Sequence, residues 1–492
     1  MVNSPTLLGL PVELQIEIAR QLDSDALSAL RLCCRELAVN TMDHFGKEYF
    51  LHRTHLYTTH SLLALRDITE TTKLARHMKF ITLVVVGVEN QRSSPPSCLI
   101  SKKDLATADS ERLWYEEERH NIQANGTTYL QQIFTNLKKL GVGRSLEIMG
   151  RLWDTRPGDD VQQIKDGSED CARYKRPTYV YGTSYFIAHV YPWATLPQIE
   201  YGSISFAAQG VKDALIRTEH AMEWLDLGCD GTGYHEQQTN FWELSNSQLA
   251  SLSASWSSLK SLRLAFEAAV PSKSLSALLS SATGLDEIGI NSRHAAYLQV
   301  FDQNLRRNQL KSVLILQMDC EYEELVRFVA RQSKSLEILD FGELLLGTAD
   351  EPENWELWKL FFGVASKCLN LKDLRLFCLL AWSQHSGHKR YFLPNGRDSY
   401  HLHVTEGEVE SQMVSISKIG IGCDTAEIED PEIEDTDEEE DGEEEDGDEE
   451  GGVEEDGEEE DSENDADDEE SNGRFDERVM RGVKEWKLYE QM

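Results

Sequence analysis

Apolar residues at helical spacing open the sequence. Leu14, Ile18 and Leu22 recur every four residues, so they share one face of a helix that begins near Pro11. Proline suits a first helical turn, because its missing N–H would have no partner there. Polar breaks then separate two further apolar runs, which predicts three short helices over residues 5–50. A unit this small cannot bury all its apolar surface alone, so we expect it to need a partner.

A second hydrophobic pattern, L-x-x-L-x-L, recurs between residues 51 and 380. The segments begin at Leu137, Met222, Leu259, Leu285, Leu310, Leu336 and Leu371. The four central segments are spaced by 26, 25 and 26 residues, each with an apparent helix between them. A regular period of roughly 20–29 residues is typical of leucine-rich repeats. The pattern therefore predicts an α/β solenoid in which each repeat adds one strand and one helix.

The alternation within each segment separates core from surface. The fourth and sixth positions would point into the core, and the third, fifth and seventh would point outward. Parallel stacking would give one concave sheet with the helices outside it. The outward positions mix arginine, acidic and aromatic side chains, a mixture that suits protein recognition. The candidates for binding a protein target are Trp224, Asp226, Arg263, Glu287, Asp340 and Arg375.

The segments around the repeats carry weaker patterns. Residues 51–79 are apolar at helical spacing, and the β-branched run 80–86 predicts a buried strand. The largest insertion between repeats covers residues 150–201. Apolar and polar residues alternate in much of 381–423, which predicts terminal strands or a cap. Four histidines lie in or beside this region, but no motif supplies an acidic ligand, so we expect no metal site. They are His385, His388, His401 and His403.

The C-terminal part has an extreme charge pattern. The net charge is −39, and residues 427–470 contribute 31 acidic side chains and no lysine or arginine. A segment of this composition cannot bury enough apolar area to order itself, so 424–473 is predicted to be a disordered acidic tail. Residues 474–492 then predict an amphipathic helix that docks on the solenoid or binds a partner. Its apolar face is Phe475, Val479, Val483 and Trp486.

Composition excludes several classes of function. Without the tail the net charge is about −8, and nucleic acid binding needs a basic surface, so we expect no nucleic acid partner. We find no apolar stretch long enough for a membrane span, and therefore expect no membrane contact. The nine cysteines are scattered without C-x-x-C spacing, which indicates reduced thiols in the cytoplasm or nucleus and no zinc site. No nucleotide, hydrolase or metalloprotease motif is present, so we predict a binding protein with no cofactor rather than an enzyme.

The first fifty residues resemble the F-box, the helical module that docks on the adaptor Skp1 in cullin-RING ubiquitin ligases. The F-box pattern falls without a gap on residues 10–35, and Ser24 and Leu37 depart from its usual proline and aromatic residue. The resemblance implies that Skp1 is bound through Leu10, Pro11, Leu14, Ile18, Leu22, Leu27, Leu30 and Cys34. The repeats likewise resemble the leucine-rich repeat domains that follow the F-box in many fungal and animal proteins.

The resemblance implies a substrate-recognition subunit of an SCF (Skp1-cullin-F-box) ubiquitin ligase, which binds a protein target with its repeats and performs no bond chemistry. Two alternatives remain open, a Skp1-bound scaffold outside the ligase and a binder of basic proteins that uses the acidic tail. The expected fold class is α/β, with an N-terminal three-helix F-box, a leucine-rich-repeat-like solenoid and a disordered acidic tail.

Overall fold

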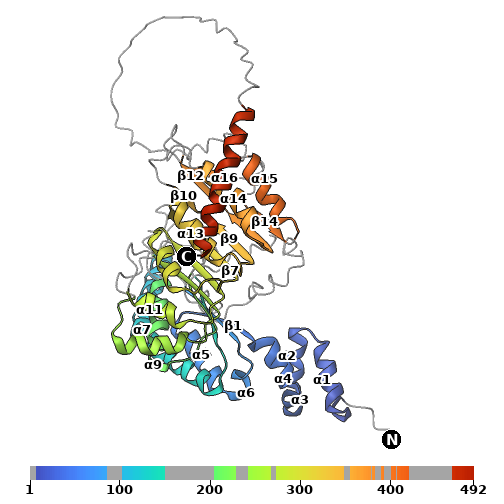
Figure 1. The fold of residues 1–492 in the computed structure, drawn as a ribbon. Coiled ribbons are helices and arrows are strands. Elements are labelled where there is room, and N and C mark those ends of the chain that lie inside the picture. The colour runs from blue at the N-terminus through green and yellow to red at the C-terminus, as the bar shows by residue number, and fades with distance from the viewer. Residues whose placement is uncertain are drawn as a thin grey trace, which may run out of the picture.

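The computed structural model describes a mixed α/β protein built around a large, mostly parallel sheet (Figure 1). The described residues are 7–85, 102–149, 204–228, 242–266, 273–347, 355–377, 379–382, 389–392, 401–405, 407–419 and 468–491. The predicted insertion 150–201, the tail up to residue 467, His385 and His388 lie outside them.

Short helices make up the N-terminal module, which we define as residues 7–50. They are η1 (Leu7–Gly9), α1 (Val12–Arg20), α2 (Ser24–Cys33), α3 (Arg35–Asn40) and α4 (Met42–Phe50). The third predicted helix is therefore two helices, because the chain leaves helical geometry at Thr41. Figure 1 shows the module extending to one side of the rest of the protein, the body.

The main sheet stacks its strands in the order in which they occur in the chain. The strands are β1 (His52–Leu56), β2 (Phe80–Val84), β3 (Ser145–Met149), β4 (Trp224–Leu227), β5 (Ser261–Phe266), β6 (Glu287–Ser292), β7 (Ser312–Leu316), β9 (Ile338–Gly342), β11 (Asp373–Phe377) and β14 (His401–Thr405). All neighbours pair in parallel except β14, which is antiparallel to β11. Sequential parallel strands require a crossover between each pair, and helices supply most of these.

The helices of the body pack beside one another in nearly the same order. They are α5 (Thr59–Glu70), α6 (Thr72–Ala75), α7 (Lys102–Leu140), α9 (Ile204–Thr218), α10 (Asn246–Trp256), α11 (Lys273–Ser281), α12 (Ala296–Asn304), α13 (Tyr322–Gln332), α14 (Trp355–Cys368) and α15 (Val409–Ile419). Each main helix contacts the next one along the chain, so the core continues from unit to unit in the manner of a solenoid.

Alternation along the strands separates the core from the opposite face as predicted. Leu262 and Leu264 of β5 are almost fully buried, while Arg263 between them points to the other face. The same register holds along the sheet, where Arg263 pairs with Asp226 on one side and with Gly289 on the other. We call the side of the sheet that carries Arg263, opposite the helices, the open face.

A second, smaller sheet was not anticipated from the sequence. It contains β8 (Asp319–Cys320), β10 (Leu345–Leu346), β12 (Leu379–Trp382) and β13 (Lys389–Phe392). The turns before β8 and β10 use Gln317 and Glu343 in the left-handed region, at φ 53° and 52°. The side-chain amide of Gln317 donates to Glu343 at 2.8 Å, which links the two turns. These turns redirect the chain after a main strand.

Two sequence predictions about the body were wrong. Residues 51–79 are not helical throughout, because β1 opens the sheet before α5 begins. Leu137 does not open a strand, since it lies in α7, and β3 follows only after Gly141 and Gly143 adopt positive φ and end the helix. The region predicted as terminal strands or a cap contains the strands β13 and β14, and its residues 409–419 form the helix α15, whose buried Val409, Met413 and Ile416 follow a helical spacing.

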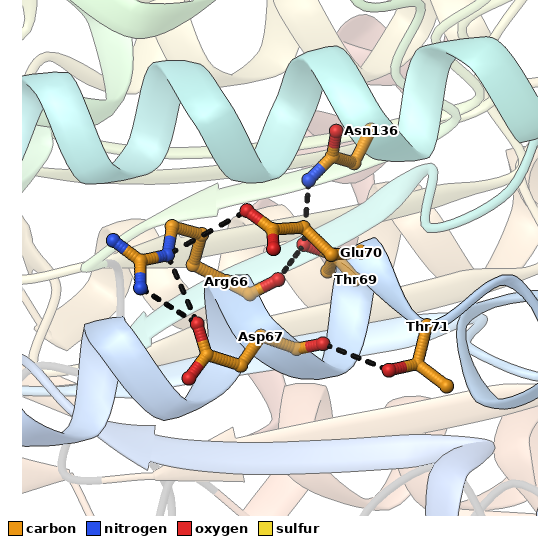
Figure 2. Close-up of polar contacts among 6 residues, drawn as sticks. All are labelled: Arg66, Asp67, Thr69, Glu70, Thr71 and Asn136. Atoms are coloured by element: carbon orange, nitrogen blue, oxygen red, sulfur yellow. Dashed lines mark hydrogen bonds and ion pairs between the residues drawn. The ribbon is translucent and has the colours of Figure 1, made fainter.

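Polar contacts fix α5 against the long helix α7 (Figure 2). Asn136 of α7 donates from its side-chain amide to the Thr69 hydroxyl at 3.3 Å, and that hydroxyl donates to the Arg66 carbonyl at 2.7 Å. The Arg66 guanidinium also pairs with Asp67 at 2.7 Å and with Glu70 at 3.7 Å. Among these contacts, the Asn136–Thr69 hydrogen bond joins α5 to α7, and the Arg66 contacts lie within α5.

The C-terminal helix α16 (Asp468–Gln491) packs against α13 and α14 (Figure 1). It begins at Asp468, earlier than predicted, and its predicted apolar residues Val479, Val483 and Trp486 are buried. Docking on the body was one of two sequence expectations for this helix, and it is confirmed. No helix in the described part of the chain is long and apolar enough to cross a membrane.

Candidate functional site

The N-terminal module turns its most apolar stripe outward. Leu14 and Ile18 of α1 are 50% and 37% exposed, and Leu8 and Val12 are each 44% exposed. The neighbouring stripe of the same helix, Gln15 and Ala19, is buried within the module at 2% and 0%. The stripe that the sequence marks as hydrophobic is therefore available to another molecule. In α2, Leu32 is likewise 87% exposed.

A buried glutamine fixes α1 in this orientation. The Gln15 side-chain amide donates to the Leu10 carbonyl at 2.8 Å, and its oxygen accepts from Asn40 of α3 at 2.9 Å. A buried amide needs such partners, because leaving them unmade costs about 1–3 kcal/mol. Rotating α1 to bury Leu14 would break both bonds. The hydrogen bonds of the buried Gln15 thus keep the apolar stripe outside.

Arginine and cysteine side chains hold the remaining helices of the module together. Arg31 of α2 donates to the Ala38 carbonyl at 2.7 Å and lies over the Phe45 ring at 3.9 Å, so it joins α2 to α3 and α4. The thiol of Cys34 caps α3 by accepting from the Leu37 amide at 3.5 Å. Leu37, where F-box proteins often carry an aromatic residue, is buried. These contacts stabilise the module without using the exposed stripe.

The predicted adaptor-binding residues do not all lie at the surface. Leu27 is buried at 1% exposure, so it belongs to the core of the module. Pro11 is exposed as the residue before α1, and Leu10, Leu22, Leu30 and Cys34 are partly exposed. Only Leu14 and Ile18, together with Pro11, offer largely free surface. Leu8 and Val12 extend the same surface. The four-residue spacing between them could have indicated both residues from the sequence.

The module meets the body through α4 and the residues just after α6. Gly46 of α4 lies so close to the His77 ring that a Cβ there would stand 2.1 Å from it. Asp43 pairs with Arg76 at 3.4 Å and with Lys47 at 2.9 Å. The contact therefore lies at the α4 end of the module, and α1 faces away from it.

The open face of the body carries the second candidate surface, a pocket of about 320 Å³ between β5 and β11. The residues that line it are Arg263, Asp286, Glu287, Lys311, Ser312, Leu314, Glu337, Ile338, Asp340 and Arg375. Gly289 lets the Arg263 side chain cross over β6, since a Cβ there would stand 2.7 Å from the Arg263 Cγ.

One wall of the pocket is an arginine–carboxylate pair. The Arg263 guanidinium donates to Glu287 Oε1 at 3.1 Å from Nε and at 2.6 Å from the terminal nitrogen. Both side chains are largely shielded from solvent, at 16% and 12% exposure, which limits screening of the pair. The guanidinium carbon also lies 5.9 Å from the centre of the Trp224 ring. Trp224 therefore borders this wall of the pocket.

The opposite wall is a second charge cluster. Arg375 pairs with Asp373 at 2.5 Å, and the His403 ring lies 3.0 Å from the other oxygen of the same carboxylate. Asp340 lies next to Arg375 in the central row of the sheet, with Leu314 on its other side. Burial raises the pKa of Asp340 to about 6, against the opposing effect of Arg375 and Arg263. Asp340 forms no hydrogen bond or ion pair with any residue that the structure describes.

Charged residues that directly precede the strands form a ladder across the N-terminal ends of the strands. Arg144, Glu223, Lys260, Asp286, Lys311, Glu337 and Lys372 are consecutive cross-strand neighbours, joined through backbone hydrogen bonds. Ion pairs join Arg144 to Glu223 at 3.1 Å, Asp286 to Lys311 at 3.3 Å, and Glu337 to Lys372 at 3.0 Å. These ion pairs engage Lys311, Asp286 and Glu337 at the rim of the pocket. Its alternating signs at the second position of each repeat were readable from the sequence.

The structure brings most of the predicted target-binding residues together. Arg263 and Glu287 form one wall with Trp224 beside Arg263, and Asp340 and Arg375 lie in the other wall. Asp226 was wrongly expected to be presented for binding. It is buried, and its carboxylate accepts from the Gly228 amide at 3.0 Å, which stabilises the turn after β4. Sequence reasoning missed the hollow itself, because space between side chains has no signature along the chain.

Within the described residues, no group of three or more histidine, cysteine, aspartate or glutamate side chains is placed to hold a metal ion. Of the four histidines near the end of the body, His403 contacts Asp373 and His401 lies in β14. A scan against protein-family models finds no match for this chain, and a search of curated proteins finds no relative.

Proposed function

We propose that the chain is the substrate-recognition subunit of an SCF (Skp1-cullin-F-box) ubiquitin ligase. The N-terminal module would bind a Skp1-like adaptor, and the leucine-rich-repeat-like body would hold a protein target on its open face. One observation carries the proposal, the coincidence of the F-box pattern with an apolar stripe that faces solvent. Leu14 and Ile18 belong to that pattern and are both exposed.

The energetics of this surface favour a protein partner. An exposed apolar patch next to charged side chains is typical of an interaction site, and Glu13, Glu17 and Arg20 accompany the stripe on α1. Covering each partly exposed leucine, isoleucine or valine would contribute about 1–2 kcal/mol to binding. Since α1 faces away from the contact between α4 and α6, an adaptor can reach it without displacing the body.

The body suits the other half of this role. Its open face holds the half-buried Arg263–Glu287 pair beside Trp224, and arginine and tryptophan are enriched at the centres of protein interfaces. A subunit with two separate surfaces raises the local concentration of a target near a catalytic partner. In this proposal the chain itself performs no bond chemistry.

The direct test replaces the exposed stripe. The double variant Leu14→Asp/Ile18→Asp should lose recovery of a Skp1-like adaptor in affinity purification, because two carboxylates would have to be desolvated at the interface. Circular dichroism and thermal unfolding should match the parent chain, since neither side chain is in the core. The matched control is Leu488→Asp on α16, which alters an apolar residue of 59% exposure far from the module. Undiminished adaptor recovery by the double variant would refute the assignment.

Copurification separates the ligase role from a scaffold role. A recognition subunit should recover a cullin together with the adaptor, and both should disappear in the double variant. A Skp1-bound scaffold outside the ligase would recover the adaptor alone. Recovery of the adaptor without any cullin, from cells in which the proteasome is inhibited, would therefore favour the scaffold.

A further inference from the structure

The pocket on the open face has a specific electrostatic imbalance. Its cations are already paired, Arg263 with Glu287, Lys311 with Asp286 and Arg375 with Asp373. Among its carboxylates, Glu337 is paired with Lys372. The carboxylate of Asp340 alone among these charged lining groups has no ion pair within the described residues. An incoming group would therefore meet a negative charge that its surroundings compensate only in part.

The shape of the pocket adds a second requirement. Asp340 is flanked in its row by Leu314, and Ile338 lies on the same strand two residues away, so apolar surface borders the carboxylate. A group that fills the pocket must carry a positive end and an apolar stem. Lysine and arginine side chains have this form, because their methylene groups can lie on apolar surface while the charged end reaches a carboxylate.

We propose that this pocket receives the side chain of a lysine or arginine of the protein target, with its stem along Leu314 and Ile338 and its charged end at Asp340. This rests on the proposed function in one respect, that the open face holds a protein. Burial has raised the pKa of Asp340 to about 6, because Arg375 and Arg263 offset only part of the desolvation of its charge, and a bound cation would add to that compensation.

An anionic group fits the pocket less well. A phosphate or carboxylate would have to displace Glu287 from Arg263 or Asp373 from Arg375, and both carboxylates are nearly inaccessible, at 12% exposure each. Leaving such a carboxylate buried without its arginine is costly. The pairs therefore act as rigid walls, and Asp340 determines the sign of the ligand.

Peptides with one variable position test the proposal in the full-length chain. Fluorescent Gly-Ser-X-Ser-Gly peptides, with X as lysine, arginine, leucine or phosphoserine, are titrated by fluorescence anisotropy. The lysine and arginine peptides should bind about tenfold more tightly than the leucine peptide, the scale of one charge-assisted contact. Asp340→Asn should abolish this preference. The acidic tail is the same in both proteins, so its attraction for basic peptides cancels in the comparison.

The matched control is Asp319→Asn, which removes an exposed carboxylate from β8. It should leave the lysine preference unchanged, and an equal loss in both variants would overturn the proposal by assigning the effect to overall charge. Tighter binding of the phosphoserine peptide would overturn it, as would equal affinity for all four peptides. Spermidine binding as tightly as the lysine peptide would also overturn it, since the ligand would then be a small amine.

Disulfide capture tests whether the preference belongs to this pocket. Ser312→Cys places a thiol in the lining, and its rate of exchange is measured with cystamine, hydroxyethyl disulfide and dithiodipropionate. The ratio of the cationic to the neutral rate cancels the reactivity of the thiol itself, and the chain with Ser312 reports the background from native cysteines. We expect this ratio to exceed one and to fall several-fold when Asp340→Asn is added. A preference for the anionic reagent, or a ratio insensitive to Asp340, would overturn the proposal.

Neither experiment contains an adaptor, so their outcome is distinguishable from that of the proposed function. Loss of the lysine preference with intact adaptor recovery would remove only the pocket assignment. A lysine preference that survives in a chain unable to recover any adaptor would leave a protein-binding pocket without a ligase.

Discussion

Two amphipathic helices near the two ends of the described chain differ in the exposure of their apolar faces. Helix α1 carries Leu14 and Ile18 on a face that remains exposed, whereas α16 carries Val479 and Trp486 on a face that is almost fully buried. Their sequence patterns are alike, an apolar residue every three or four positions. The difference shows that such a pattern marks a surface to be covered without saying what covers it.

The partners of each helix explain the difference. In α16, Gly482 faces Val364 of α14, and Gly363 of α14 faces Val479, so the two backbones approach closely at both points. In α1 the inward face is filled by Gln15, whose hydrogen bonds fix the orientation of the helix. Gly482 and Gly363 thus let α16 pack closely on the body, and the buried Gln15 keeps the apolar face of α1 turned outward.

The largest expected effect comes from removing the anchor of α16. Trp486→Ala should destabilise the protein by about 3–5 kcal/mol, because a fully buried indole packed near Phe361 would leave a large cavity. Urea denaturation followed by circular dichroism measures the change. A loss below about 1 kcal/mol would mean that α16 contributes little to the body, and the comparison with α1 would fail.

Tight backbone contact predicts the next effect. Gly482→Ala should destabilise the protein by about 1–3 kcal/mol, because the new Cβ would stand 2.6 Å from Val364 Cγ2, and this overpacking outweighs the helical preference for alanine. Adding Val364→Ala should recover part of that loss. Simple additivity of the two single variants in a double-mutant cycle would show that the helices do not meet at this point.

Acid should act first at the N-terminal end of the body. Burial lowers the pKa of His55 in β1 to about 3 and also lowers the pKa of His52. Because the unfolded chain takes up a proton near pH 6.5, the folded state loses stability as pH falls from 6.5 toward 3. The slope for each such histidine is at most about 1.4 kcal/mol per pH unit.

Hydrogen exchange at decreasing pH measures where that loss occurs. After correction for the intrinsic pH dependence of exchange, amides of β1 and α5 should lose protection before those of α14 and α16. His55→Gln should flatten the stability curve below pH 6.5. Uniform loss of protection along the chain would show that the acid response is not set by these histidines.

The smallest expected effect is on the exposed stripe. Leu14→Ala should change the free energy of unfolding by less than about 0.5 kcal/mol, because the side chain leaves no cavity when it is removed. Leu488→Ala, on the exposed side of α16, should behave in the same way. A loss of 2 kcal/mol or more for Leu14→Ala in thermal or urea unfolding would place this residue in a core, and α1 and α16 would no longer differ.

Local patterns predicted much of the fold because the physics behind them is local. The strands around Leu262, Ile288 and Val313 were found from alternation, since one face of each strand must be buried. The same reasoning failed at Leu137, where leucines at strand spacing also fit the last turn of α7. A six-residue pattern cannot distinguish helix from strand at a position where a helix ends shortly before a strand begins. The two glycines after α7 were the more reliable signal.

The open face was predicted as a set, but the pocket within it was not. Five of the six proposed residues line or border the pocket, because the strand register aligns equivalent positions. Asp226 occupies an equivalent position and is buried all the same, since its carboxylate folds back onto the turn after β4. The sequence predicts which residues align across neighbouring strands, whereas the solvent exposure of each side chain depends on the contacts that it makes in the folded protein.

The sequence by itself determined the apolar and polar faces, the stacking order of most strands and the charge of each segment. These features follow from the hydrophobicity and the charge of each residue, which the sequence gives directly. Only the tertiary structure decided that α16 covers the body while α1 stays open, and that Asp340 has no ion pair with any described residue. Those outcomes depend on distances between residues far apart in the chain, which fix the free energy of each contact.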